Sequence, residues 1–548
     1  MIVYQIFTRL FGNRNTTRKE WGSVAENGSG KMNDIDAQVL KRIKAMGVTH
    51  VWFTGVLRHA TQTDYTAYGI PAQNAEVVKG CAGSPYAITD YYDIDPDLAV
   101  DVNKRMQEWE SLIARTHKAG MKVIMDFVPN HVARQYHSVC KPNGVRDLGE
   151  DDDVNMHFST RNNFYYCWGQ PLDLGDVTDS QTYHEAPARA TGNDHFDNRP
   201  GRNDWYETVK LNYGVDYCDA GGRSEHFDPI PDTWTKMTDI LMYWAGKGVD
   251  GFRCDMAEMV PAAFWAYATK VVKMVYPHII FIGEVYNPSL YRTYIGAGFD
   301  LLYDKVGMYD SLRDIVCGRR WASDITTQWQ QTDDIRDHML YFLENHDEQR
   351  IASDFFAGEP WAAYPAHIVS CLLHTNPYML YAGQELGERG MDKEGFSGCD
   401  GRSTIFDYWS MDSVNHGYFD IRKKTPSERK LMEAYKRVML IAEKEKAASR
   451  GLTFDLMYVN GHLAQSQYAF LRKKDDELLL VVANFAAEAI DTGVIIPSHA
   501  FEYMSIAEGD VDAVDLLSDG KAKLHLALNE AVNVAVPAHG GVVYKIKQ

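Results

Sequence analysis

The sequence predicts an α/β fold: a parallel (β/α)8 barrel of the TIM type, with a subdomain inserted after the third strand and an all-β sandwich domain at the C-terminus. Three observations lead to this fold class. Short apolar strands alternate with amphipathic helical segments over the larger, N-terminal part of the 548 residues. A long interval within that part lacks periodicity. The C-terminal part carries strand-like segments without helices between them.

Eight apolar segments of strand length define the predicted barrel. They cover residues 2–7, 50–54, 122–127, 249–255, 279–284, 299–303, 339–345 and 377–382. Residues 34–46 and 104–119 carry apolar side chains at helical spacing, and Gly47 and Gly120 follow them as helix stops. Because strands that alternate with helices build parallel sheets, eight such units are typical of a barrel rather than a sandwich.

The rest of the sequence predicts the domain limits. Residues 132–227 are rich in Asp, Asn, Gly and aromatic residues. A structureless loop of that length is uncommon in a compact domain, so we expect an inserted subdomain there. The barrel then comprises residues 1–131 and 228–447. Beyond it, short strand-like segments predict the C-terminal sandwich domain over 448–548; they are 454–457, 468–471, 478–484, 532–536 and 542–546.

The charge balance excludes several classes of partner. The chain has 56 Lys and Arg against 75 Asp and Glu, a formal net charge of −19. Proteins that bind nucleic acid or anionic membrane surfaces need positive patches, so we expect neither partner. No apolar run is long enough to span a bilayer. With no signal peptide before the first strand, we expect a cytoplasmic protein, or an exported one whose leader has been removed. The oligomeric state stays open.

Acidic residues stand at the ends of two neighbouring predicted strands. The fourth strand ends in Arg253 and Asp255, which share a face because they are two residues apart. The guanidinium favours an ionised carboxylate, as a nucleophile requires, although a structural ion pair is the alternative. The fifth strand ends at Glu284 among apolar neighbours, where desolvation raises a carboxyl pKa and suits it to general-acid work. For Glu284 alone, a surface charge is the alternative.

Two more strands end in residues of the same kind. The seventh ends in Asn345-His346-Asp347, and the third carries Asp126 before Asn130-His131. In β/α barrels the carboxyl ends of the strands form the active-site face. Carboxyl groups and histidines at one mouth, without a Cys/His cluster suited to zinc, suggest carboxylate-pair chemistry on a neutral substrate. Cleavage of a glycosidic bond is the leading example.

These segments resemble the sequence motifs of the α-amylase superfamily, glycoside hydrolase family 13. Residues 126–131, 251–255, 283–285 and 345–347 are similar to its first to fourth motifs, in order. Residues 209–213 resemble the additional motif near the end of the family's inserted domain, and residues 86–91 resemble the segment after the second strand. The likeness covers nearly the whole chain.

The resemblance implies a retaining α-glycoside hydrolase that acts on α-glucans or malto-oligosaccharides by double displacement. In that reaction Asp255 is the nucleophile, Glu284 is the general acid and then the base, and Asp347 binds ring hydroxyls and favours the distorted sugar. Two carboxyls of a retaining pair lie about 5–5.5 Å apart, so neighbouring strand ends suit them.

The resemblance also implies binding residues. Arg253 orients the nucleophile, His131 and His346 bind sugar hydroxyls, and Tyr86 stacks beneath the sugar. No organic cofactor is implied. Asn130 matches the position that ligates a structural calcium ion in some members of the family.

Departures from the family pattern leave open which molecule accepts the sugar released from the substrate. Glu258 and Met259 replace the Lys-His pair of typical α-amylases, and Ala87 stands where many exo-acting α-glucosidases carry Asp. Transfer of an α-glucosyl or maltosyl group at the same site is therefore the alternative to hydrolysis. A second alternative is a non-catalytic barrel used as a binding or scaffold subunit, against which the intact acidic triad argues.

Overall fold

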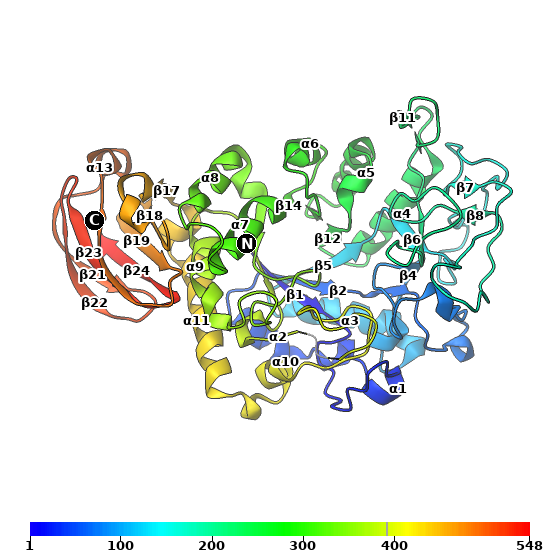
Figure 1. Cartoon of the computed structure of the whole chain (residues 1–548), viewed down its shortest axis with the longest axis horizontal. Coiled ribbons are helices and arrows are strands. Elements are labelled where there is room, and N and C mark those ends of the chain that lie inside the picture. Colours follow the sequence, from blue (N-terminus) through cyan, green and yellow to red (C-terminus); the bar gives the residue numbers. More distant parts are fainter. Residues whose placement is uncertain (391–392) are drawn as a thin grey trace.

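The computed structural model describes residues 1–390 and 393–548. A closed barrel of eight parallel strands lies in the centre, with the insert on one side and the C-terminal domain on the other (Figure 1). The predicted fold class is confirmed. The limits drawn from the sequence for each domain stay predictions.

The barrel strands pair in the order β1-β16-β15-β14-β13-β12-β5-β2, and β1 closes the ring against β2. They are β1 Ile2–Phe7, β2 His50–Thr54, β5 Lys122–Phe127, β12 Gly251–Cys254, β13 Ile280–Gly283, β14 Leu301–Tyr303, β15 Met339–Phe342 and β16 Tyr378–Tyr381. Each corresponds to a predicted strand. The fourth, fifth and seventh are shorter than predicted, so Asp255, Glu284 and Asn345 lie just beyond the strand ends.

Alternation along the strands separates the barrel interior into an apolar and a polar layer. One apolar cluster fills the barrel: Val3, Trp52, Ile124, Ile282, Leu301, Tyr303, Tyr309, Leu340, Phe342 and Met379. Two positions after several of these apolar residues, on the same side of the chain, stands a polar residue. Gln5 comes two positions after Val3, and Glu284 two positions after Ile282. The polar side chains therefore gather at the carboxyl end of the barrel.

Helices follow most of the barrel strands and cover their outer face. The α-helices are α1 Val24–Asn27, α2 Ala37–Lys44, α3 Arg105–Lys118, α4 Asp232–Gly246, α5 Ala262–Val275, α6 Tyr291–Gly296, α7 Asp310–Val316, α8 Asp324–Gln331, α9 Tyr364–Leu372, α10 Asp412–Val414, α11 Pro426–Lys444, α12 Lys446–Arg450 and α13 Ser498–Met504. Both predicted helix stops are left-handed, with φ of +88° at Gly47 and +76° at Gly120, where a Cβ would be strained. The glycines thus turn the chain from helix into strand.

The insert contains only short strands. Those between β5 and α4 are β6 His131–Ala133, β7 Tyr166–Cys167, β8 Ala188–Arg189, β9 Thr208–Lys210, β10 Val215–Asp216 and β11 Ser224–Glu225. Strand β6 pairs antiparallel with β9, which places His131 opposite Lys210. A further hairpin, β3 Leu57–His59 with β4 Ile88–Ile94, follows the second barrel strand. The β6–β9 pair therefore attaches the end of the insert to the exit of the third barrel strand.

The C-terminal domain is built mainly of β-strands, with the α-helix α13 between β20 and β21. A six-stranded antiparallel sheet has the order β17-β18-β19-β24-β21-β22, beside the two-stranded sheet β20-β23. The strands are β17 Leu452–Asp455, β18 Gln467–Lys474, β19 Glu477–Asn484, β20 Ile490–Ile495, β21 Gly509–Asp515, β22 Lys521–Leu526, β23 Ala531–Val536 and β24 Gly540–Lys547. Sequence reasoning missed β20, β21 and β22; in β21 and β22, charged residues on the outward faces mask the apolar alternation.

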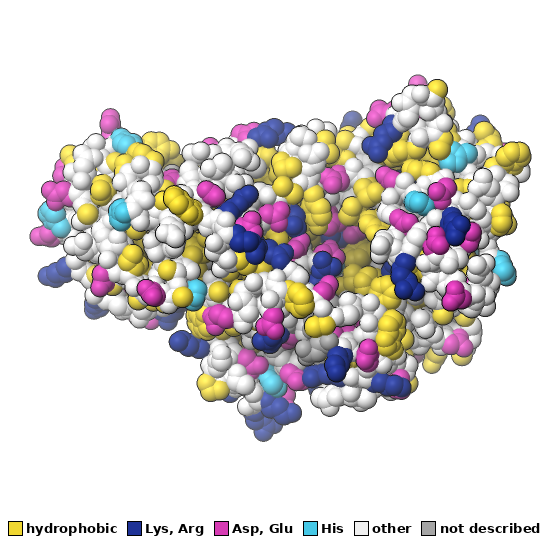
Figure 2. Space-filling model, viewed as in Figure 1, with side chains coloured by type: hydrophobic (Ala, Val, Ile, Leu, Met, Phe, Trp, Pro, Cys, Tyr) yellow, Lys and Arg dark blue, Asp and Glu magenta, His cyan; other side chains and the backbone are white. Residues whose placement is uncertain are grey.

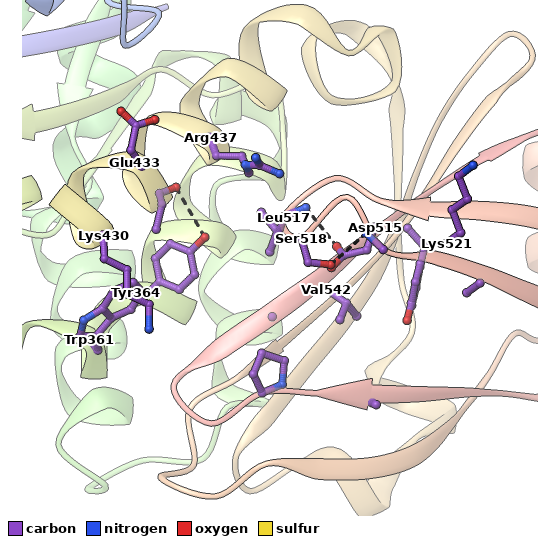
Figure 3. A pocket seen from close by; sticks show the side chains of 17 residues that line it. Trp361, Tyr364, Lys430, Glu433, Arg437, Asp515, Leu517, Ser518, Lys521 and Val542 are labelled. Carbon is purple, nitrogen blue, oxygen red and sulfur yellow. Dashed lines mark hydrogen bonds between the residues drawn. The ribbon is translucent and has the colours of Figure 1, made fainter. Parts of the chain in front are cut away.

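A groove of about 550 Å³ lies where this domain meets the barrel helices α9 and α11 (Figure 3). Trp361, Tyr364 and Lys430 line it from the barrel side, and Asp515 and Val542 line it from the sheet. None of the residues predicted for the active site is among those that line it. No helix in the described ranges is long and apolar enough to cross a membrane.

Candidate active site

The Arg253 guanidinium joins the carboxyls at the ends of two neighbouring strands. Arg253 is fully buried on β12, where its Nη1 donates to Asp255 Oδ1 at 2.6 Å and its Nη2 lies 2.9 Å from Glu284 Oε2. Strand pairing explains this meeting, because β12 and β13 run in parallel register and the Glu284 backbone N–H donates to the Cys254 carbonyl. The two acids predicted to act together therefore share one cation.

Aromatic rings enclose that cation. The Arg253 guanidinium carbon lies 5.2 Å from the centroid of the Trp52 ring and 5.4 Å from that of Tyr86, and its Nε donates to the Tyr303 hydroxyl at 3.2 Å. Rings around a guanidinium stabilise its charge and exclude water. The cation is consequently held in one position, and so are the two carboxyls that bind it.

Glu284 accepts two hydrogen bonds in addition to its ion pair with Arg253. Besides Arg253, its Oε2 accepts the Met256 backbone N–H at 2.8 Å, and its Oε1 accepts the Tyr286 hydroxyl at 2.6 Å. Met256 has a left-handed backbone with φ of +43°, an uncommon conformation for a residue with a side chain, and it directly follows Asp255. The turn after β12 thus bends so that its N–H reaches the acid on the next strand.

Several carboxyl groups of the active-site cluster surround one permanently charged group, the Arg253 guanidinium. Burial raises the pKa of Asp255; Arg253 opposes this shift, and the nearby Glu284 carboxyl reinforces it. Burial likewise raises the pKa of Asp126, whose Oδ2 accepts the Gly55 N–H. Both carboxyls are therefore harder to ionise here than in water.

Asp347 sits in a chain of contacts that starts on the first strand. The Gln5 amide donates to His346 Nδ1 at 2.9 Å, which leaves Nε2 to carry the ring proton toward Asp347 Oδ2 at 3.0 Å. The Tyr86 hydroxyl also lies 2.5 Å from that Nε2. Burial raises the pKa of Asp347, but its interactions with His346 and the charges of Arg253 and Arg402 outweigh this effect and lower the pKa to about 2. Asp347 is therefore a carboxylate at physiological pH.

His131 lies at the insert side of the same region. Burial and the charges of Lys210 and Lys79 lower the pKa of His131 to about 3, so its imidazole is neutral. Its ring centroid lies 5.1 Å from that of Trp205, an aromatic residue of the insert. A neutral imidazole both donates and accepts hydrogen bonds, which suits contact with hydroxyl groups.

Asn130, predicted to ligate calcium, is buried beside His131. Its Nδ2 donates to the Gly192 carbonyl at 2.7 Å, and its Oδ1 accepts from the Lys210 ammonium at 2.6 Å. A side-chain cation thus already contacts the oxygen that the calcium prediction requires.

Sequence reasoning missed several residues of the cluster, among them Gln5, Tyr286 and Tyr303. Gln5 is the only polar residue of the apolar strand Ile2–Phe7, and it is fully buried. Such an isolated polar residue on a barrel strand is a usable signal for the site. Nothing in the sequence distinguishes Tyr286 and Tyr303 from the many other tyrosines of the chain.

Glu258, at a position where the family pattern differs, fastens a loop beside the site. Its Oε2 accepts the backbone N–H groups of Tyr286 at 3.1 Å and Asn287 at 3.0 Å. The residue therefore holds the segment that presents the Tyr286 hydroxyl to Glu284. Figure 2 shows the molecule hollowed near the middle of this face, over the barrel strands of Figure 1.

Comparisons with known proteins agree with this fold. The family profile described as "Alpha amylase, catalytic domain" matches residues 5–415. Alpha-amylase 3 of Dictyoglomus thermophilum is 24% identical over 423 residues, covering 73% of this chain and 74% of that protein. Neopullulanase 2 of Thermoactinomyces vulgaris is 21% identical over 507 residues, covering 89% and 69%. The structure of an α-amylase from Geobacillus thermoleovorans, complexed with acarbose, has a similar fold, with a TM-score of 0.66 at 18% identity over 100% of this chain and 98% of that one.

Proposed function

This chain belongs to the α-amylase family of glycoside hydrolases, and on that premise we propose that it cleaves α-glucosidic bonds of α-glucans or malto-oligosaccharides by double displacement with retention. One observation carries the proposal: a single buried guanidinium binds both Asp255 and Glu284. A carboxyl pair held this closely leaves little room for the water that an inverting enzyme places between its acids.

In the first step Asp255 attacks the anomeric carbon, and the bond to the leaving oxygen breaks as Glu284 donates its proton to that oxygen. A glycosyl ester on Asp255 results. In the second step Glu284, now a carboxylate, takes a proton from water, whose oxygen attacks the same carbon and releases Asp255. The chemistry needs no organic cofactor, because the two carboxyls supply both nucleophile and proton.

The surrounding residues stabilise the charge and shape of the transition state. The Asp347 carboxylate and His346 face hydroxyls of the sugar ring. The Asp347 carboxylate also stabilises the positive charge that develops on the ring in the transition state. Neutral His131 binds another hydroxyl from the insert side, and the Tyr86 ring lies beneath the sugar. Arg253 keeps Asp255 oriented between the two steps.

The product profile on maltoheptaose tests this function. We expect shorter malto-oligosaccharides, and proton NMR of the first minutes of reaction should show the α-anomer before mutarotation. First release of the β-anomer would contradict the retaining reaction. Early products longer than maltoheptaose would reassign the site to glycosyl transfer, and no product from maltose, amylose or pullulan would favour a binding role.

The acid limb of the pH profile should lie higher than for an ordinary aspartate. Asp255 must be ionised to attack, and its pKa is raised above the usual value of about 3.9. As the pH falls through this raised pKa, Asp255 takes up a proton, and kcat/KM therefore falls. The measurement is kcat/KM on a chromogenic malto-oligoside from pH 4 to 9, at pH values where the Tm is unchanged. Full activity down to pH 4 would contradict the expectation.

A further inference from the structure

A buried ammonium group occupies the junction between the barrel and the insert. Lys210 lies on β9 and its side chain is 2% exposed. Its Nζ is 2.6 Å from Asn130 Oδ1 and 2.6 Å from Asp194 Oδ1, and it donates to the Met259 carbonyl at 3.5 Å. These oxygens come from three segments: the exit of the third barrel strand, the insert, and the turn after the fourth barrel strand.

Such a set of oxygens would attract a metal ion if the lysine were absent. Calcium binds carboxylate, amide and carbonyl oxygens at about 2.3–2.6 Å. An ion bound to both Asn130 Oδ1 and Asp194 Oδ1 would compete for these oxygens with the Lys210 Nζ, which lies 2.6 Å from both. The residues around Asn130 therefore do not fit calcium while Lys210 is in place.

A second cluster of side chains, which has the geometry of a metal site, is also neutralised by side-chain cations. Among the described residues, Asp90, Asp93 and Cys140 lie close enough to share an ion. The Arg58 guanidinium lies 3.1 Å from Asp90, and Arg105 donates to Asp93 at 2.7 Å. Here too a side-chain cation supplies the positive charge.

We propose that the Lys210 ammonium takes the place of a structural divalent cation and ties the insert to the barrel, so that the fold does not depend on calcium. Three further contacts support this role. Lys210 faces His131 across the β6–β9 pair, the Asn130 amide contacts the Gly192 carbonyl of the insert, and a Cβ on Gly192 would come within 2.8 Å of the His131 Cβ. The ammonium thus holds the segment that positions His131 at the site.

The charges around Lys210 are consistent with an ammonium in this position. Burial lowers the pKa of Lys210, and the Asp194 carboxylate opposes that shift. The charge of Arg223 lowers the pKa of Lys210 as burial does, and both cations lie over the Tyr217 ring, with the Lys210 Nζ 5.8 Å from its centroid. Asp194 is consequently the counter-ion of the site.

The test compares melting temperatures in EDTA and in millimolar CaCl2. The wild type should show the same Tm in both. Lys210→Ala removes the ammonium and leaves its three oxygens in place, so we expect a Tm several degrees lower in EDTA. Calcium should restore part of that loss, because an ion that binds only the folded state stabilises it. Isothermal titration with CaCl2 should show binding to Lys210→Ala and none to the wild type.

Lys79→Ala is the matched control. Lys79 is also a buried lysine at the insert, but it pairs with Glu207 at 3.0 Å and the Asp204 carbonyl, without a second side-chain oxygen. It should lose stability without gaining a calcium response. A Lys210→Ala variant that behaves like this control overturns the proposal, and so does a calcium-dependent rise in the Tm of the wild type. If Lys210→Ala folds only when calcium is present, the proposal is supported; if it fails to fold in both buffers, the wild-type comparison decides.

Discussion

Asp255→Asn and Glu284→Gln should each lower kcat on maltoheptaose by on the order of 10⁴-fold or more, the scale expected when a nucleophile or its proton donor is removed. The reason is geometric, because both carboxyls contact one guanidinium: Asp255 lies 2.6 Å from its Nη1, and Glu284 lies 2.9 Å from its Nη2. An amide keeps the shape of either side chain but neither attacks nor transfers a proton. Initial rates of reducing-sugar release measure the loss.

The Tm separates this result from misfolding. Because burial and Glu284 raise the pKa of Asp255, an uncharged Asn relieves repulsion, and we expect the Tm of Asp255→Asn to be equal to or above that of the wild type. Asp304→Asn is the matched control, since Asp304 is also a buried carboxyl beyond a barrel strand, but it caps the segment after β14 by accepting the Met308 N–H. It should keep kcat close to that of the wild type. Near-normal turnover by either test variant would rule out the proposed roles.

Arg253→Met should have the next largest effect, on activity and stability together. It leaves Asp255 and Glu284 buried without their shared cation, a change that costs about 3 kcal/mol or more. It also removes the group that orients the nucleophile, so we expect kcat to fall by on the order of 10²–10³-fold. Differential scanning fluorimetry at pH 5 and pH 8, with initial rates at each pH, measures both effects.

The pH dependence of that stability loss has a definite sign. Without the guanidinium the folded-state pKa of Asp255 rises further above its unfolded value. A carboxyl with a raised pKa favours the folded state at low pH, and that contribution is lost as the pH rises through the folded pKa. The Tm gap between Arg253→Met and the wild type should therefore be larger at pH 8 than at pH 5. An equal gap at both values would show that Arg253 acts through packing alone.

Arg253→Lys distinguishes charge from geometry. It keeps the positive charge, but an ammonium lacks the fork by which a guanidinium binds two carboxyls at once. We expect much of the stability to return and little of the activity. If Lys restored full activity, the double contact with Asp255 and Glu284 would have no importance for the reaction.

Much of the fold could be predicted from local pattern. The barrel strands are short apolar runs between helices, and Gly47 and Gly120 mark turns that only glycine adopts without strain. The strands predicted to end at Asp255, Glu284 and Asn345 were too long. Those residues look like continuations of an apolar run, but they leave the sheet and lie in loops. In the C-terminal domain, charged outward faces hid β21 and β22.

The sequence by itself predicted which groups would carry the chemistry and which barrel strands they follow, because alternation along a strand and the order of the strands along the chain are local properties. Only the tertiary structure decided how those groups are paired. Arg253 binds Asp255 and Glu284 together, and Lys210 takes the oxygen of Asn130 that suggested calcium. These contacts join segments far apart in the sequence, and their distances depend on how the barrel closes and where the insert packs, which no local pattern encodes.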